Sequence, residues 1–222
     1  MTPKLALLEE YALIARALGA PHRMMLLEQL AQGERGVEAL ADKVGVSVAN
    51  CSQHLQQLRR AGLVTSRRAG KAVIYRMTDD KTLVLMDLLG QIARQNLSVV
   101  DDILQGLSGG AAPEPIGRAE LAARLKEGSI TLLDMRPQDE FAMGHIPGAV
   151  QVDLSRLDAM AATLNHATEI IAYCRGPYCV YAHQAVARLR QLGLSAGRLD
   201  GGLPEWRADG RQVFVALASE EP

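Results

Sequence analysis

A segment rich in glycine, alanine and proline divides the chain and constrains the possible folds more than any other feature. Residues 107–117 (LSGGAAPEPIG) follow neither a helical nor a strand period, as is typical of a boundary between domains. The 222 residues therefore predict two domains, each near the usual size for an independent core. We place the first domain at residues 1–106, the linker at 107–115 and the second domain at 116–222.

The composition excludes several classes of protein. Hydrophobic residues make up 48% and charged residues 22% of the chain, which excludes disorder of the whole chain. No apolar run reaches the length of a membrane-spanning helix, and Glu9 and Glu10 interrupt the N-terminal apolar pattern, so we expect no signal peptide. Three cysteines are too few for a secreted disulfide framework. We expect a cytoplasmic protein that has no membrane partner and no cofactor.

The first half predicts helices followed by one hairpin, a mainly α domain. An apolar stripe at helical spacing runs from Leu5 to Leu18, and Gly19 ends it. The further helices that we predict cover residues 21–33, 37–45 and 48–61, and a single long helix covers residues 81–107. A long terminal helix of this kind commonly packs against a second subunit, which favours a homodimer over packing within one chain.

Two of the short helices have the spacing of a helix-turn-helix, with a tight turn at Gly45 and Ser47 as the N-cap of the second helix. One face of that second helix is apolar and predicts core positions at Val48, Cys51, Leu55 and Leu58. The other face and its flank carry Ala49, Asn50, Gln53, His54 and Gln57. Amide side chains can hydrogen-bond base edges in a major groove, although polar amides on a solvent-exposed face are also ordinary.

The segment between Asp42 and Asp79 contains no acidic residue and seven basic ones, which indicates a surface for a polyanion. Residues 63–77 predict a β-hairpin that turns at Gly70 and has its basic side chains around the tip, a position from which they can contact phosphates. The DNA-binding residues predicted in addition to the helix face are Arg59, Arg67, Arg68, Lys71 and Arg76.

These residues resemble the ArsR family of winged-helix repressors. The similarity lies in VGVSVANCSQHLQQLRRAGLV and RAGKAVIYRM and covers about residues 5–105. It implies a homodimer that binds double-stranded operator DNA with an inverted repeat, one recognition helix per half-site. Metal-sensing members of the family use Cys near the first helix of the motif or Asp and His in the last helix. Because this chain has no Cys or His at those places, we predict no metal site.

The second half alternates strands with helices and predicts an α/β domain with a parallel sheet. The strand EIIAYC ends at Cys174, and a helix begins near Val180. Chemistry in such sheets takes place at the carboxyl ends of strands. The loop amides, the helix N-terminus and Arg175 would all stabilise a thiolate there, so we predict a reactive Cys174.

This half resembles a single rhodanese domain, through LLDMRPQDEFAMGHIPGAVQVDL, YCRGPYC and LDGGLPEW over about residues 116–215. The resemblance implies that Cys174 accepts a sulfane sulfur from a small-molecule donor and holds it as a persulfide. The candidate catalytic loop is Cys174, Arg175, Gly176, Pro177, Tyr178 and Cys179. The family motif also includes Asp134, Arg136, Glu140 and His145, which we assign to structural hydrogen bonds and ion pairs.

The loop departs from the usual family pattern at two positions. Cys179 stands where Arg is frequent, and Pro177 replaces a commoner Gly. Loss of that Arg weakens an anion pocket, so poor thiosulfate turnover is expected. The two thiols five residues apart could close a disulfide or a sulfur-bridged link once Cys174 carries sulfur.

Three functions remain compatible with the sequence. The preferred one is a DNA-binding transcriptional repressor whose rhodanese-like domain senses or transfers reactive sulfur through Cys174, with Cys179 as resolving thiol. The second is a thiosulfate-type sulfurtransferase with an accessory DNA-binding domain, so enzymatic turnover stays open. The third is an oxidant or arsenical sensor that uses the same two cysteines.

Overall fold

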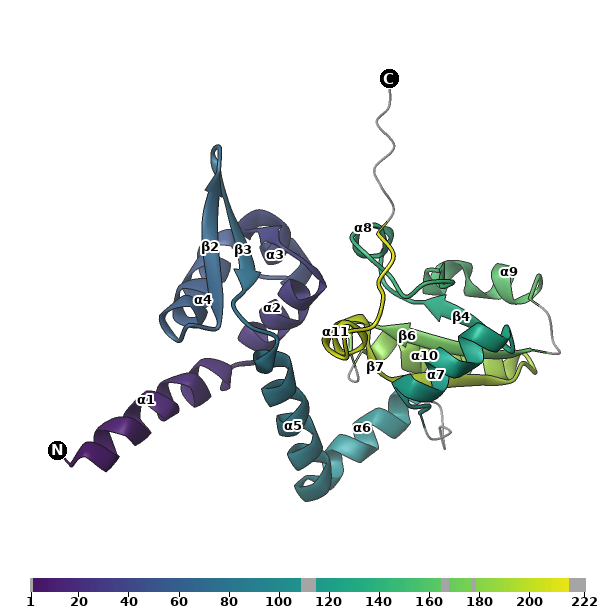
Figure 1. The fold of residues 1–222 in the computed structure, drawn as a ribbon, viewed down its shortest axis with the longest axis horizontal. Coiled ribbons are helices and arrows are strands. Elements are labelled where there is room, and N and C mark those ends of the chain that lie inside the picture. Colours follow the sequence, from purple (N-terminus) through teal and green to yellow (C-terminus); the bar gives the residue numbers. More distant parts are fainter. Residues whose placement is uncertain (1, 109–114, 165–167, 177–178, 216–222) are drawn as a thin grey trace. The chain divides into compact units, whose positions relative to one another are not determined.

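The computed structural model describes residues 2–108, 115–164, 168–176 and 179–215. The chain divides into two compact units, Met1–Met86 and Asp87–Pro222 (Figure 1). Most of the linker predicted at residues 107–115 lies outside the described residues. No helix in the described ranges is both long enough and apolar enough to cross a membrane.

The first unit combines helices with a small antiparallel sheet of order β1-β3-β2 (Figure 1). Its elements are α1 (Pro3–Leu18), α2 (Pro21–Gln32), β1 (Arg35–Gly36), α3 (Val37–Val44), α4 (Val48–Arg60), β2 (Val64–Ala69), β3 (Ala72–Met77) and the start of α5 (Lys81–Asn96). Gly45 ends α3 with a φ of 72°, a left-handed conformation that glycine adopts without steric cost. Strand β1 was not predicted, because two residues carry no alternation of their own and become a strand only by pairing with β3.

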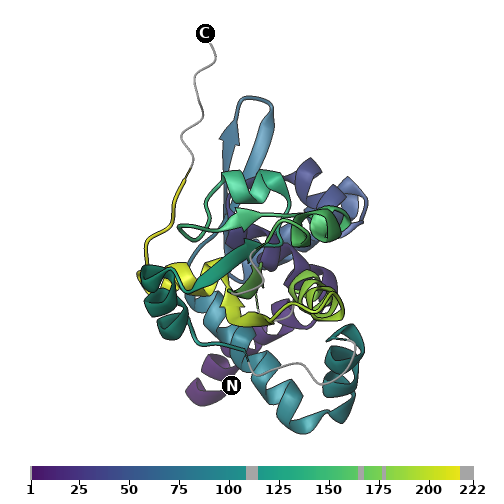
Figure 2. The ribbon, with the colours of Figure 1, turned by 90° about the vertical axis from the view of Figure 1, so that its right-hand side faces the viewer.

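The hairpin of β2 and β3 turns at Gly70, as predicted, and extends away from the helices of its unit (Figure 1, Figure 2). Its strands are longer than the sequence indicated. Arg67 and Arg68 lie within β2, opposite Ile74 and Val73, and not in the turn. The prediction placed them around the tip; it was wrong because strand pairing continues to Ala69 and leaves only Gly70 and Lys71 between the strands.

The core of the first unit is built from α2, α3, α4 and the hairpin. Its fully buried side chains include Leu26, Leu27, Leu40, Cys51, Leu55 and Leu58. The prediction that Cys51 is a core residue is confirmed, whereas Val48 is 45% exposed and not a core residue, because it lies in the first turn of α4. Helix α1 contributes only its last two residues, Ala17 and Leu18, to the buried set. The apolar stripe from Leu5 to Tyr11 is exposed in a single chain.

The single helix predicted over residues 81–107 is in fact two helices, α5 and α6 (Ser98–Ser108), with a break at Leu97. Apolar spacing continues across the break, so periodicity alone does not reveal it. The local cause lies in the polar residues on either side of it. The Asn96 amide donates to the Ile92 carbonyl, 2.8 Å away, and Ser98 begins the next helix. Both residue types favour helix ends over helix interiors.

The second unit is an α/β domain, as the strand and helix alternation predicted. Its remaining elements are α7 (Arg118–Glu127), β4 (Ile130–Asp134), α8 (Gln138–Ala142), β5 (Val150–Gln151), a 3-10 helix (Leu154–Arg156), α9 (Leu157–Ala161), β6 (Glu169–Cys174), α10 (Val180–Gln191), β7 (Ala196–Gly202) and α11 (Leu203–Ala208). The short helix α8 lies between β4 and β5.

The four-stranded sheet has the order β5-β4-β6-β7, and each neighbouring pair is parallel. Alternate residues of β6 face opposite sides. Ile170, Ala172 and Cys174 pack with residues of α9 and α10, while Ile171 and Tyr173 pack with residues of α7 and α11. Helix α6 packs against α10. Both faces of the sheet are therefore covered, as is usual for parallel sheets.

Candidate functional site

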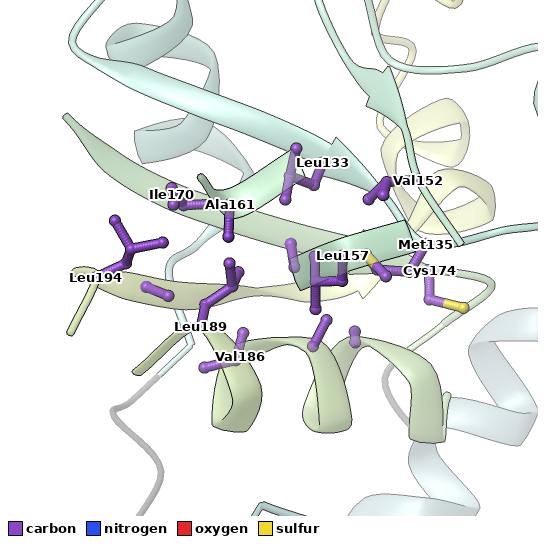
Figure 3. Packing of buried hydrophobic residues seen from close by; sticks show 14 of the residues in the cluster. Leu133, Met135, Val152, Leu157, Ala161, Ile170, Cys174, Val186, Leu189 and Leu194 are labelled. Carbon is purple, nitrogen blue, oxygen red and sulfur yellow. The ribbon is translucent and has the colours of Figure 1, made fainter. Parts of the chain in front are cut away.

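The cysteine loop joins the end of β6 to the start of α10, at the carboxyl edge of the sheet. Cys174 is the last residue of β6, and Cys179 is the N-cap of α10. The two sulfur atoms are bonded as a disulfide, with 6.0 Å between the Cα atoms. Both side chains are buried, and Figure 3 shows Cys174 with Met135 at one end of the core cluster. The loop thus brings together the two thiols that the sequence singled out.

Arg175, the residue after the reactive position, pairs with a carboxylate. Its guanidinium donates two hydrogen bonds of 2.9 Å to Glu140, whose side chain is fully buried. The same guanidinium carbon lies 5.9 Å from the centre of the Tyr181 ring. The charge expected to favour a thiolate at Cys174 is therefore partly neutralised by Glu140. Pro177 and Tyr178 of the predicted loop lie outside the described residues.

A small cleft opens near the loop. It has a volume of about 220 Å³, and its lining residues are Met135, Pro137, Asp153, Leu154, Ser155 and Tyr181. Met135 belongs to the same buried cluster as Cys174 and Cys179, and Tyr181 is the second residue of α10. The cleft is large enough for a small molecule and too small for a folded partner.

The other motif residues form a buried polar cluster next to the sheet. The Arg136 side chain donates to both carboxylate oxygens of Asp134 and to the Gly144 carbonyl oxygen, and both charged groups are fully buried. The Tyr173 hydroxyl donates to Asp134 at 2.5 Å, and burial raises the pKa of Tyr173 well above its usual value. The His145 Nδ1 lies 3.0 Å from the Phe141 carbonyl oxygen. These contacts confirm the structural hydrogen bonds and ion pairs expected of these residues.

The exposed face of α4 carries the amides that the sequence predicted. The Ser47 hydroxyl accepts a hydrogen bond from the backbone N–H of Asn50, 3.2 Å away, and so caps the helix as predicted. Ala49, Asn50, Gln53 and Gln57 are all exposed. Gln57 already has a partner, because its Oε1 accepts a hydrogen bond of 2.6 Å from Nη1 of Arg23.

His54 lies at the flank of the same face. Its ring stacks on that of His22, with 5.7 Å between the ring centres. Burial, and after it the charges of Arg23 and His22, lower the pKa of His54, so the neutral form is favoured near pH 7.

The predicted basic residues of the hairpin, together with Arg59 of α4, fall into two groups. Arg67 is paired with Glu34 at 2.7 Å, and Arg59 donates to the Ser66 hydroxyl at 3.4 Å. Arg68, Lys71 and Arg76 are exposed, and none forms an ion pair with any residue that the structure describes. The second group is therefore the better placed to contact phosphates.

Comparison with known proteins identifies both halves. Residues 18–67 match the helix-turn-helix domain family, and residues 118–209 match the rhodanese-like domain family. The HTH-type transcriptional regulator Rv0324 of Mycobacterium tuberculosis is 40% identical over 214 residues, which cover 95% of this chain and 92% of that protein. The chain belongs to the ArsR-type transcriptional regulators that carry a rhodanese domain.

Two further similarities concern the first half of the regulator. The biofilm growth-associated repressor of Agrobacterium fabrum is 40% identical over 80 residues, 36% of this chain and 68% of that protein. Among solved structures, the homodimeric winged helix-turn-helix domain of Mb0332 from Mycobacterium bovis is 37% identical. It covers 44% of this chain and 90% of that domain, with a TM-score of 0.40.

Two features of the regulator's sites escaped sequence reasoning. A Cβ atom on Gly202 would overlap the Cys174 carbonyl oxygen and lie 2.6 Å from the Gly176 nitrogen, so β7 can approach the cysteine loop only with glycine there. The two adjacent glycines of LDGG were the available signal. The second feature is Arg23, whose contact with Gln57 spans 34 residues and left no local signal.

Proposed function

We propose that the rhodanese domain of this regulator senses reactive sulfur at Cys174 and thereby changes the affinity of the helix-turn-helix domain for DNA. The observation that carries the proposal is the disulfide between Cys174 and Cys179 across the β6–α10 loop. A second thiol within bonding reach of the first gives the loop two stable chemical states, which a sensor requires.

The first step is transfer of a sulfur atom from a small donor. The thiolate of Cys174 attacks the outer sulfur of a donor persulfide or polysulfide, the donor S–S bond breaks, and the shortened donor leaves as a thiolate. The N-terminus of α10 faces this loop and favours negative charge. The cleft lined by Met135 and Tyr181 gives a small donor a place to bind.

The second step uses Cys179. Its thiolate attacks Sγ of Cys174, the bond between Sγ and the outer sulfur breaks, a Cys174–Cys179 disulfide forms, and the outer sulfur leaves as hydrosulfide. Electrons balance, because the sulfane sulfur is reduced to sulfide while the two thiols are oxidised to the disulfide. The Cα separation of 6.0 Å lies within the range that a disulfide spans.

We propose that the structural change at the cysteine loop reaches the DNA-binding domain through α10. Cys179 is the N-cap of α10, α10 packs against α6, and α6 follows α5 after the break at Leu97. A change of the cysteine loop would alter the start of α10 and hence its packing on α6. This route does not depend on the linker that the sequence suggested.

We also propose that two copies pair through apolar helix faces and read the two halves of an inverted repeat. The exposed apolar residues of α1 are Leu5, Leu7, Leu8, Tyr11 and Leu13, and those of α5 are Val84, Leu85, Leu88, Leu89 and Ile92. So many exposed large apolar side chains are unusual for a monomer. Sedimentation velocity at micromolar concentration should show a dimer, and Leu8→Glu combined with Leu88→Glu should give a monomer. A wild-type monomer that binds its operator fully would contradict this.

The DNA contacts are assigned to the α4 face and to the exposed hairpin residues Arg68, Lys71 and Arg76. Substitution Gln53→Ala should relax base preference, whereas Arg68→Ala should weaken binding to all sequences alike. A loss that is equal for all sequences from Gln53→Ala would exclude α4 as the recognition helix.

The decisive experiment for sensing is mass spectrometry of the full chain after polysulfide treatment, combined with a gel shift on operator DNA. We expect sulfur on Cys174, then the disulfide, and a changed DNA affinity. Repeated sulfur transfer to an acceptor with unchanged DNA affinity would instead support the accessory-domain sulfurtransferase. A response to arsenite or peroxide that exceeds the response to polysulfide would support the third alternative.

A further inference from the structure

Arg23, the third residue of α2, bridges the end of α1 to the exposed face of α4. Its Nε donates to the Ala17 carbonyl at 2.5 Å and its Nη2 to the Arg16 carbonyl at 2.7 Å. Its Nη1 donates to Oε1 of Gln57 at 2.6 Å. All of these residues belong to the first unit.

The chemistry of arginine fixes the orientation of the Gln57 amide. A guanidinium has five N–H donors and no acceptor, so only the amide oxygen of Gln57 can face it. The NH2 group is then the part of Gln57 left for another partner, and the side chain is exposed. Bidentate recognition of adenine needs both the oxygen and the nitrogen of the amide. Arg23 occupies one of the two lone pairs of the Gln57 oxygen and holds that oxygen on its own side, so the NH2 group is the part of the amide that Gln57 presents.

We propose that Arg23 is a specificity-determining residue, which positions Gln57 as a hydrogen-bond donor that selects guanine over adenine. Guanine presents two acceptors, N7 and O6, in the major groove. Adenine presents the amine N6 beside N7, and that amine can bond Gln57 only through the second lone pair of the oxygen that Arg23 holds. The inference rests on the assignment of α4 as recognition helix in the proposed function.

The anchoring of Arg23 explains why the arrangement is in place before DNA binds. The last carbonyl groups of a helix lack helical partners and favour a nearby cation. Two such carbonyls of α1 hold the guanidinium, so little ordering is left to occur when DNA arrives. The bond to Gln57 has a charged donor, which makes it stronger than a bond between neutral groups.

A purely structural role for Arg23 predicts something different. If Arg23 only caps α1, its loss should lower stability and overall affinity while the preferred base stays the same. If Arg23 orients Gln57, its loss should change the base at one position of the site. Base preference therefore separates the two roles.

The test is selection from a randomised double-stranded DNA library with the full-length protein and three variants. Gln57→Ala identifies the base pair that Gln57 reads, because preference is lost there. At that pair the wild type should favour G·C over A·T by about fivefold or more, the lower end for a good base contact. Arg23→Met frees the Gln57 oxygen and should reduce that ratio to parity or reverse it. Arg60→Met is the control: it removes one charge from exposed α4 surface and should keep the ratio.

Preference for A·T at the Gln57 position in the wild type would overturn the proposal, and this outcome requires no variant at Arg23 to fold. An unchanged ratio in Arg23→Met with a native melting temperature would also overturn it. If Arg23→Met unfolds, Arg23→Lys is measured in its place. Lysine keeps the charge but has no guanidinium that can contact Ala17, Arg16 and Gln57 at once. An unchanged ratio of G·C to A·T preference in this variant counts against the proposal. If neither Gln53→Ala nor Gln57→Ala alters the selected motif, the recognition-helix assignment itself has failed.

Discussion

The two units of the regulator contain cysteine and arginine in opposite settings. In the first unit, Cys51 is a free thiol inside α4 and fully buried, whereas Arg68 is exposed on the hairpin. In the second unit, Cys174 ends a strand and is bonded to Cys179, whereas Arg175 is held by a buried carboxylate. Cys51 and Cys174 are equally buried, so burial does not distinguish the core cysteine from the one that we propose to react.

The path of the backbone makes the difference. The backbone amide of Cys51 donates to the Ser47 carbonyl, 2.9 Å away, and the neighbours of Cys51 are apolar. At the end of β6 the chain turns into the start of α10, where amides without helical partners and a second thiol are available. The hairpin of the first unit thus carries exposed arginines such as Arg68, whereas in the second unit Arg175 is paired with Glu140 and Cys174 lies in a loop that leads into a helix N-terminus.

The largest effect is expected from removal of the reactive thiol. Cys174→Ser should abolish sulfur uptake and the response to polysulfide while DNA binding persists, because the nucleophile is lost and the first unit is untouched. Cys179→Ser should stop at a Cys174 persulfide, since no second thiol can displace the sulfur. Mass spectrometry and gel shifts on the same samples give both readouts.

Cys51→Ala is the matched control for these variants, because it removes an equally buried thiol. Uptake and response should match those of the wild type. If Cys174→Ser still responds normally and Cys51→Ala does not, the comparison between the two thiols is inverted and sensing lies in the first unit.

The next effect concerns the glycine beneath the loop. Gly202→Ala should destabilise the second unit by about 1–3 kcal/mol or more, because the new Cβ overlaps the backbone of residues 174–176. Trp206 is the one tryptophan of the chain, so its fluorescence in a urea titration reports on this unit. Gly197→Ala is the control, since its Cβ would meet side-chain ends and no backbone, Cδ1 of Ile171 at 3.2 Å and Oε1 of Glu169 at 3.5 Å. Equal losses from both substitutions would mean that the close approach at the loop has no special cost.

Local signals explain which parts of this architecture the sequence predicted. Helix α2 lies between Pro21 and Gly33, and β6 ends at Cys174, as expected from residues that start or stop elements. The parallel sheet and the reactive position followed from the same local pattern. The break at Leu97 did not, because apolar spacing continues through it.

Contacts between distant residues explain what was missed. Arg175 meets Glu140 and Arg23 meets Gln57 across 35 and 34 residues. Only the tertiary fold determines such pairs, and they decide which charges remain free. The sequence therefore indicated candidate side chains for both sites but not which of them are already bonded to other residues.

The third effect sharpens the description of Cys51 as an inert core residue. Burial raises the pKa of the Cys51 thiol, so the native state keeps its proton where the unfolded chain would lose it. The free energy of unfolding is therefore unaffected by this thiol below its ordinary pKa of about 8.5. Above that pH the unfolded chain loses the proton first, and the free energy of unfolding decreases by at most about 1.4 kcal/mol per pH unit. Urea titrations followed by circular dichroism should show a steeper alkaline loss for wild type than for Cys51→Ala. Parallel curves would indicate that solvent reaches Cys51 in the native state.

The smallest effect separates two neighbouring arginines of the hairpin. Arg68 has no ion pair among the described residues, whereas Arg67 is paired with Glu34 at 2.7 Å. Each phosphate contact contributes about one unit to the slope of log K against log salt, so Arg68→Ala should lower the slope by about one. Arg67→Ala should lower it by less, because its charge is already partly compensated, and Glu34→Gln should raise the slope by freeing Arg67. Filter-binding titrations on one operator duplex across a salt series measure all three variants.

If Arg67→Ala and Arg68→Ala lower the slope equally, the Glu34 pair opens on DNA binding and the hairpin uses paired and unpaired arginines alike. Arg67 and Arg175 are both paired with a carboxylate, but Glu34 is exposed and Glu140 is buried. That result would mean that burial of the carboxylate partner, and not the ion pair itself, decides whether an arginine can be released.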